Sequence, residues 1–122
     1  MKYLLVSLGG VLGANARLLI GAWIAARWER GFPLGTFLIN VSGSLLIGIY
    51  TAAAQRHGWH ENGRFFCCVG FLGAFTTFST FSLESLKLLQ DGHPDTALKY
   101  ILGSLLCGLA SAAAGWWLGS KI

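Results

Sequence analysis

The sequence predicts an all-α membrane protein, a single domain over residues 1–122 with four transmembrane helices. Three observations support this fold class. Hydrophobic residues make up 54% of the chain and charged residues only 11%, whereas a soluble domain typically has about 25% charged residues. Four apolar runs are each long enough to cross a bilayer, which takes about 20 residues. The short connectors hold most of the charged residues and both prolines, so no soluble domain fits between the spans.

Lysine and arginine are divided evenly between the two ends of the predicted spans, which cover residues 3–26, 34–54, 65–89 and 98–118. An even number of spans puts both termini on one side of the bilayer. Lys2, Arg56, Arg64 and Lys121 fall on that side, and Arg27, Arg30, Lys87 and Lys99 fall on the other. Because an excess of Lys and Arg sets the orientation of a membrane protein, this balance leaves orientation almost unspecified. The even count favours dual topology and pairing with an inverted copy. The alternative is a weak preference for one orientation that so few Lys and Arg residues do not reveal.

Small residues recur at helical spacing on the first and fourth spans: Gly9, Gly13, Ser111, Gly115 and Gly119. In lipid such residues let helix backbones approach closely. We therefore expect them to supply the contact surfaces of an antiparallel homodimer.

Two ionisable residues lie inside the predicted spans, and such residues are functional candidates because they are costly in lipid without a partner. Arg17 lies near the middle of the first run, where the alternatives are pairing, contact with backbone carbonyls or snorkelling to the interface. Glu84 lies in the third run, with Lys87 one turn later as a candidate partner. A structural role and a pathway role for Glu84 both stay open.

The second span carries a polar stripe. Thr36, Asn40 and Ser44 are four residues apart, so a helix places them on one face, and that face must contact protein or water. Asn40 is the most informative because its amide offers two donors and an acceptor deep in the membrane. An interhelical hydrogen bond and a place in a pore are equal alternatives for it.

The third span contains "GAFTTFSTFSLE", residues 73–84, where hydroxyl or carboxylate side chains fill six of the nine positions from 76 to 84. Gly70 and Gly73 precede the Thr76-Thr77 pair, a combination typical of a broken membrane helix. A break frees carbonyl oxygens, which are tolerated at that depth only in protein or beside a cavity and can coordinate a cation. The sequence therefore predicts that the third helix is broken near its middle, over residues 73–76.

Phe75, Phe78 and Phe81 recur between these hydroxyl residues. A phenyl ring has a positive edge, so an anion could lie against ring edges with hydroxyl and amide hydrogens nearby. That arrangement would form an ion pathway. The alternative is that the rings pack against lipid or protein while the hydroxyls bond to the preceding turn of their own helix.

Other functional classes have little support. The three cysteines lie in apolar runs without zinc-ligand or redox spacing. His57 and His60 have no thiol or carboxylate pair beside them, so we expect no metal site there. Basic residues are spread over the ends of the spans rather than clustered, so we expect no nucleic-acid partner. No nucleophile and base pair is visible, and we expect the protein not to be an enzyme.

Three segments resemble the Fluc family of fluoride channels, also called CrcB proteins: "GGVLGANAR" from Gly9, "GTFLINVSGS" from Gly35 and "GFLGAFTTFSTFSLE" from Gly70. The last is highly specific, and the order and spacing of all three agree along nearly the whole chain. The resemblance implies an antiparallel, dual-topology homodimer in the bacterial plasma (inner) membrane, with two parallel fluoride pores and a sodium ion at the centre of the dimer interface. The implied function is passive export of fluoride, which lowers its cytoplasmic concentration.

The resemblance also implies roles for individual residues. The pore asparagine and the two ring-edge phenylalanines are matched by Asn40, Phe78 and Phe81, and the backbone carbonyls that bind sodium are matched by Gly73 and Thr76. A polar track leading away from the rings would begin at Ser79 and Thr80, with Glu84 and Ser104 as further candidates. Arg17 matches the first-span arginine of the family, and we expect it to have a structural or vestibule role. Ala74 departs from the family pattern, which often has a second glycine at that position.

The alternative function is a small dual-topology multidrug exporter coupled to protons. Such an exporter needs a carboxylate at mid-membrane, usually on the first span, where this chain offers Arg17 and no acid. A third reading, a structural subunit of a membrane complex, would predict no ion flux.

Overall fold

The computed structural model describes residues 1–28 and 31–122, and these residues are helical apart from short connectors. Arg30, one of the basic residues counted above, lies outside the described residues. The elements are α1 (Lys2–Ala25), α2 (Leu34–His57), α3 (Glu61–Arg64), η1 (Phe65–Leu72), α4 (Gly73–Phe75), α5 (Phe78–Gln90) and α6 (Pro94–Gly119). The third span comprises α3, η1, α4 and α5, and η1 is a π-helix. Four segments are long and apolar enough to cross a membrane, which confirms the prediction of four apolar spans.

Three of the four spans are longer than predicted because their ends extend into the polar connectors, whereas the first span has the predicted length of 24 residues. Gly58 ends α2 in the left-handed conformation, with φ 62°, which glycine adopts without steric cost. Pro94 occupies the first turn of α6, where its fixed φ suits a helix start and its missing N–H has no consequence.

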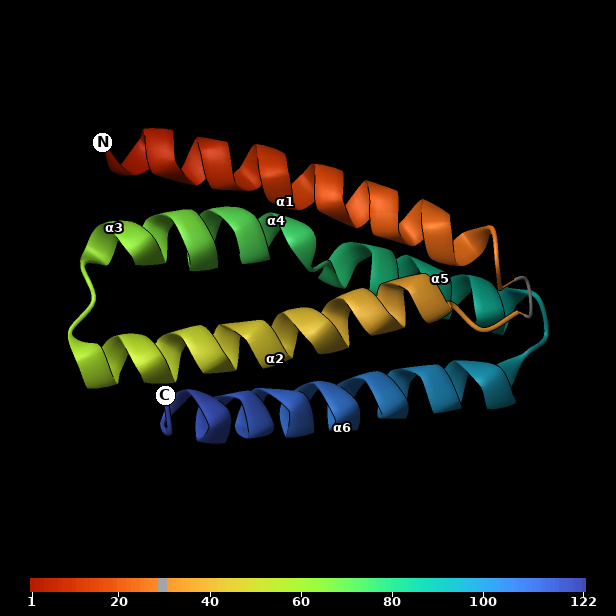
Figure 1. Ribbon diagram of the computed structural model, residues 1–122. Helices are drawn as coiled ribbons and strands as arrows, with labels where there is room; N and C mark the ends of the chain where they lie inside the picture. The colour runs from red at the N-terminus through yellow and green to blue at the C-terminus, as the bar shows by residue number, and fades with distance from the viewer. Residues whose placement is uncertain (29–30) are drawn as a thin grey trace.

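The four spans lie side by side, and both termini lie at the same end of the bundle (Figure 1). α1 packs chiefly on η1 and α4, while α2 packs along α6. Beyond the break in the third span, α5 turns toward α6 and the beginning of α2. The described part of the third span therefore has one half beside α1 and the other beside α6.

Glycines bring helix backbones together within one chain. A Cβ at Gly9 or Gly13 of α1 would overlap the backbone of η1, and a Cβ at Gly115 or Gly119 of α6 would overlap the backbone of α2. Ser111 lines a small pocket shared with α2. The expectation that the four glycines supply the contact surface for a second copy is therefore wrong, because partners within the chain already cover them, and for Ser111 it stays a prediction.

The third span is broken near its middle, as the sequence predicts. Thr76 has ψ 160° and Thr77 has φ −151° and ψ 122°, so both residues are extended. The first half ends at Phe75 and α5 starts at Phe78. Two hydroxyl-bearing residues thus interrupt the helix at membrane depth.

The break lies later than the glycines that were expected to cause it. Gly73 is helical, with φ −63° and ψ −34°, and Gly70 lies inside η1. Gly70 instead lies against the backbone of α1, where a Cβ would meet the carbonyl oxygen of Val6. The extended conformation is taken by the β-branched threonines, which suit it better than they suit a helix.

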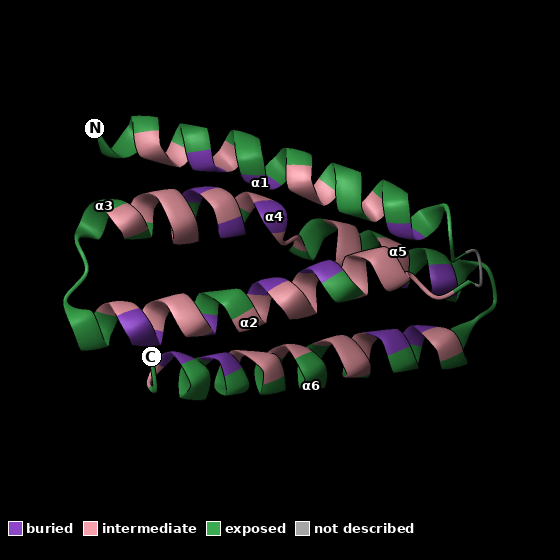
Figure 2. Cartoon of the chain, viewed as in Figure 1, coloured by how far each residue is buried: buried purple, intermediate pink, exposed green. Residues whose placement is uncertain are grey.

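Exposed side chains cover most of the outer faces of the bundle, and buried positions are few (Figure 2). Many exposed residues on α1 and α6 are large and apolar, as lipid contact requires. Two small buried clusters join the spans. One contains Ile39, Leu72 and Phe75 beside the break, and the other contains Leu88, Ala97 and Tyr100 between α5 and α6.

Candidate functional site

Asn40 of α2 holds the break in the third span. Its Nδ2 donates a hydrogen bond to the carbonyl oxygen of Thr77 at 3.0 Å, and its Oδ1 accepts one from the Thr77 backbone N–H at 2.8 Å. These two bonds satisfy backbone groups that the interrupted helix leaves without a partner, which is costly in a membrane. The interhelical bond is therefore present, and the second N–H of the Asn40 amide is left for a further acceptor.

Thr77 caps the N-terminus of α5 and gathers two other hydroxyl residues around it. Its Oγ1 accepts from the Thr80 backbone N–H at 3.3 Å and donates to Thr80 Oγ1 at 3.1 Å. Ser79 Oγ lies 3.5 Å from the same oxygen. The structure thus brings Ser79 and Thr80 together with Thr77 directly after the break.

Glu84 is bound by hydroxyl donors from two other spans. Thr36 Oγ1 donates to Glu84 Oε1 at 2.6 Å, and the Tyr100 hydroxyl donates to Oε2 at 3.4 Å. Glu84 is half-buried and Tyr100 is fully buried. The partners of this carboxylate are therefore on α2 and α6, and not at Lys87 as the sequence suggested. Charge-assisted bonds of this kind are stronger than neutral ones.

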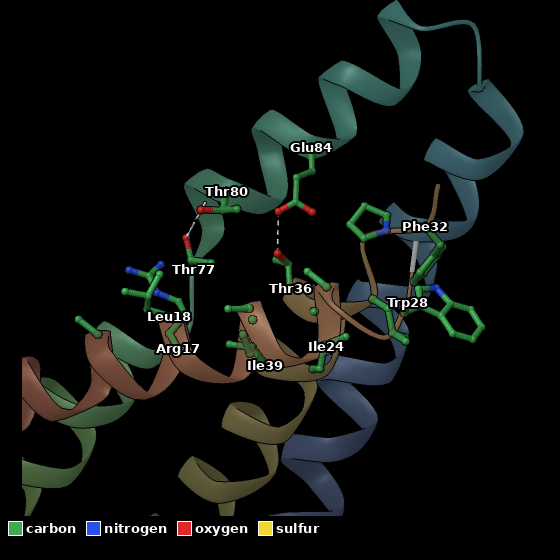
Figure 3. Close-up of a pocket in the computed structure, with 17 residues that line it drawn as sticks. Arg17, Leu18, Ile24, Trp28, Phe32, Thr36, Ile39, Thr77, Thr80 and Glu84 are labelled. Atoms are coloured by element: carbon green, nitrogen blue, oxygen red, sulfur yellow. Dashed lines mark hydrogen bonds between the residues drawn. The ribbon is translucent and has the colours of Figure 1, made fainter. Parts of the chain in front are cut away.

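A groove of about 530 Å³ runs along this polar edge of α5. Figure 3 shows Arg17, Thr77, Thr80, Thr36 and Glu84 around it, with dashed bonds from Thr77 to Thr80 and from Thr36 to Glu84. The Arg17 side chain comes from α1 and lies near Thr77 (Figure 3). An arginine, a carboxylate and several hydroxyls therefore share one groove, and the structural or vestibule role of Arg17 stays a prediction.

The phenylalanines at the break have different surroundings. The Phe78 ring is 76% exposed and lines a second pocket, of about 290 Å³, together with Asn40. The Phe81 ring packs inside the protomer, edge to face on Tyr100 with ring centroids 5.1 Å apart. The two rings still contact each other, with centroids 5.8 Å apart and planes inclined by 49°. Only Phe78 therefore presents a largely free ring beside Asn40.

Ser104 forms no hydrogen bond with these groups. Its hydroxyl oxygen is buried and has no hydrogen-bond partner among the described residues. Neither pocket beside the break includes Ser104 in its lining. The place of Ser104 in a polar track therefore stays a prediction.

The carbonyl oxygens before the break fit a hard cation. The N–H of Thr77, which would bond to the Gly73 carbonyl in a continuous helix, bonds to Asn40 instead. Among the described residues no backbone bond outside the helices accepts at the carbonyls of Gly73 or Thr76. The described part of the chain also has no group of three or more His, Cys, Asp or Glu that could hold a metal. Any cation here would therefore depend on such carbonyl oxygens.

Sequence reasoning missed two residues of this site. Thr77 was recognised only as part of a hydroxyl-rich stretch, although a threonine directly before a helix is a common N-cap signal. Tyr100 was not singled out from the sequence. Its burial and its bond to Glu84 depend on how α5 packs against α6, which no local pattern reveals.

Comparison with known proteins agrees with this architecture. The family model described as "CrcB-like protein, Camphor Resistance (CrcB)" matches residues 4–116. A protein of Thermus thermophilus named "Fluoride-specific ion channel FluC" is 44% identical, with 99% of this chain and 95% of the relative aligned. A protein of the same name from Acidobacterium capsulatum is 43% identical, with 100% and 98% aligned.

Another relative with this name, from Anaeromyxobacter dehalogenans, is 45% identical over 93% of this chain and 90% of its own length. The family model and all three relatives span the break, Asn40 and Glu84. Four apolar spans, the interrupted third helix and these matches lead to one conclusion: the chain is a multi-pass membrane protein that belongs to the CrcB (FluC) family.

Proposed function

We propose that this protein is a fluoride-selective channel through which fluoride leaves the cell passively. The observation that carries the proposal is the geometry at the break. Asn40 bonds to both backbone groups of Thr77 and keeps one N–H for an acceptor, beside the largely free ring of Phe78. A neutral N–H and a positive ring edge suit a small anion that must pass without being trapped by a full positive charge.

The polar groups beside α5 would replace the water that fluoride loses. Hydroxyls of Thr77, Ser79 and Thr80 follow the break, and the groove continues toward Thr36 and Glu84. Each hydroxyl offers one donor that can turn toward an anion. Fluoride demands strong hydrogen bonds and is small, so a narrow passage with closely placed donors favours it over chloride.

A second copy in antiparallel orientation would complete the pore. The Phe78 ring and Gly73 are exposed in one protomer at membrane depth, where a partner is the natural cover for groups beside a polar pocket. The described basic residues are divided between both ends of the bundle, which supports insertion in either orientation. The relatives are bacterial, and we place the dimer in the plasma membrane.

A sodium ion would lie between two such copies. The carbonyls of Gly73 and Thr76 from each protomer would give four oxygen ligands around a twofold axis. When bound, the ion would supply a fixed positive charge that favours an anion nearby. Ala74 keeps its carbonyl despite the methyl group, so the departure from the family pattern leaves these ligands in place.

Proton-coupled drug export has less support. Such an exporter needs an acid at mid-membrane on the first span, and α1 contains no Asp or Glu. Arg17 has the opposite charge. The only carboxylate at membrane depth among the described residues is Glu84, which is already bound to two hydroxyls.

The proposal is tested by anion efflux from proteoliposomes loaded with potassium fluoride or potassium chloride. Valinomycin starts the efflux and an ion-selective electrode follows it. We expect fluoride to leave faster than chloride by roughly tenfold or more, and Asn40→Asp to lower fluoride efflux by at least about tenfold, since 1.4 kcal/mol on the barrier produces that change. Equal efflux of both anions would contradict the proposal.

Topology has its own test. A peptide tag at the C-terminus should be accessible to a membrane-impermeant protease from both faces of the membrane in cells and inverted vesicles. Access from one face only would refute dual topology and leave the channel function to the efflux measurement.

A further inference from the structure

The pathway around Asn40 has a continuation on the other side of the break. The groove with Arg17 and Glu84 and the pocket with Phe78 share Thr77 in their linings. A third cavity, of about 400 Å³, lies at the end of the bundle where α2 ends and α3 begins. Among the described residues, only Cys68 lines both this end cavity and the Phe78 pocket. Three cavities therefore follow one another along the third span.

We propose that the end cavity is a second mouth of the anion pathway and that Cys68 lies at the constriction between this mouth and the Asn40 site. This inference rests on the proposed function, because it assigns the route that fluoride takes on the side of the break away from Glu84. The route runs between α2 and η1, and its two ends lie at opposite ends of the bundle.

The lining of the end cavity suits an anion that is exchanging water for protein donors. Tyr50 and Gln55 of α2 bring a hydroxyl and an amide group, and Arg64 of α3 brings a positive charge. Glu61 adds one carboxylate at the same mouth. The mouth on the other side has the same combination, since Arg17 and Glu84 share its lining. The cavity at each end is therefore lined by one arginine and one carboxylate. None of these charged residues lines the Phe78 pocket that contains Asn40.

The residues that line the cavities show why Cys68 lies between them. Arg64 and Cys68 both line the end cavity, so they lie on the same side of the third span. That side looks toward α2, because Ile47 lines the Phe78 pocket and Thr51 lines the end cavity beside Cys68. The opposite face of η1 packs on the glycines of α1. Cys68 is half-buried, small and uncharged, which suits a narrow point that an anion must pass.

The test is to enlarge the Cys68 side chain chemically and measure fluoride efflux. Three single-cysteine proteins each keep Cys67, Cys68 or Cys107, with the other two replaced by alanine. Each is treated in detergent with 2-sulfonatoethyl methanethiosulfonate, so that both copies in a dimer can react. The thiolate forms a mixed disulfide with the reagent and releases methanesulfinate. Mass spectrometry measures the labelled fraction before reconstitution.

We expect labelling at Cys68 to lower fluoride efflux by about tenfold or more, and dithiothreitol to restore it. Cys107 is exposed on α6 and lines none of the three cavities, so its labelling should leave efflux within a factor of about two. Failure of Cys68 to react, or full efflux after complete labelling, would overturn the proposed route. Absence of fluoride efflux from the untreated wild type would instead refute the proposed function.

A charge substitution tests the proposed mouth independently. Arg64→Gln should slow fluoride efflux at low ionic strength and have less effect at high salt, because salt screens the attraction of a mouth arginine for an anion. Arg56→Gln is the matched control, since Arg56 lies at the same end but donates to the carbonyl oxygen of Ser120 outside the end cavity. Equal responses of the two variants would contradict the assignment of the mouth.

Discussion

The two halves of the third span use different chemistry to hold their places. The half that precedes the break packs on α1 through backbone contacts at Gly9, Gly13 and Gly70. The half that follows the break is bound to its neighbours by side chains, with Glu84 accepting from α2 and α6. Close backbone packing joins the first half to α1, whereas a groove lined by hydroxyl and carboxylate groups lies beside α5.

The difference teaches how one membrane span can serve both the fold and the site. Glycine contacts stabilise a helix pair by dispersion alone, which is the main attraction between apolar helices in lipid. Polar contacts in the other half must satisfy every donor and acceptor. Asn40 stabilises the break between the two halves because it bonds to both backbone groups of Thr77. Substitutions can therefore damage one half while sparing the other.

Gly13→Leu should have the largest effect. Its side chain would overlap the backbone of Phe71 in η1, and a backbone cannot rotate away as a side chain can. Overpacking typically costs about 1–3 kcal/mol, and we expect this contact to exceed that range and prevent α1 from docking. The yield of monodisperse protein in size-exclusion chromatography measures the effect.

Gly10→Ala is the control for this variant, because a Cβ at Gly10 has no atom within 4 Å. It should behave as wild type. If Gly13→Leu gave the same yield as Gly10→Ala, glycine packing would not hold the first half.

Asn40→Ala should have the next largest effect, and it acts where the two halves of the third span meet. The substitution leaves the N–H and the carbonyl of Thr77 without partners, at about 1–3 kcal/mol for each buried group. We expect a lower melting temperature in detergent and loss of fluoride efflux. Asn15→Ala is the matched control, since Asn15 bonds only to the carbonyl of Val11 in its own helix. Equal melting temperatures for the two variants would contradict the role given to Asn40.

The two hydroxyl donors to Glu84 should differ in how much they contribute to stability. The Thr36 bond is 2.6 Å long and the Tyr100 bond is 3.4 Å. Hydrogen bonds to charged groups contribute about 1.5–3 kcal/mol, and we expect Thr36→Val to lose most of that amount and Tyr100→Phe less. Melting temperatures of wild type, both single variants and the double variant form a double-mutant cycle. The cycle measures the coupling between Thr36 and Tyr100. A larger loss for Tyr100→Phe would reverse this order.

Thr77→Val should have the smallest effect on stability. It removes the hydroxyl that caps α5, and loss of an N-cap typically costs about 1 kcal/mol. The β-branched shape that suits the extended break is retained. Thr77→Ser restores the hydroxyl and should recover the melting temperature. A serine variant as unstable as the valine variant would show that the cap does not hold the start of α5.

The sequence predicted which side chains form this site better than it predicted where they lie in the structure. The stripe Thr36, Asn40 and Ser44 was recognised because four-residue spacing places side chains on one helix face, and Thr36 and Asn40 both contact the third span. The broken helix was recognised from its glycines and hydroxyls. The break begins at Thr76, the last residue of the predicted range, and continues at Thr77, because its position depends on where Asn40 lies across from it.

The remaining features depend on packing between spans. Gly9 and Gly13 carry a signal for close contact but not for the identity of the partner helix, which is η1 of the same chain. The π-helical form of η1 has no local sequence signal that we could use. The burial of Tyr100 and its bond to Glu84 arise only when α5 and α6 are brought together.

The central claim is that the selective anion contacts belong to Asn40 and to the side chains at and after the break, while the face of the first half that packs on α1 serves the fold. The most direct test compares fluoride efflux of Phe78→Ile and Phe71→Ile in proteoliposomes with equal amounts of folded protein. Phe78 has a largely free ring beside Asn40, and Phe71 is stacked on Phe75 with centroids 5.8 Å apart. We predict a fall of about tenfold or more for Phe78→Ile and near wild-type efflux for Phe71→Ile. Equal efflux from both variants, or a greater loss at Phe71, would contradict the claim.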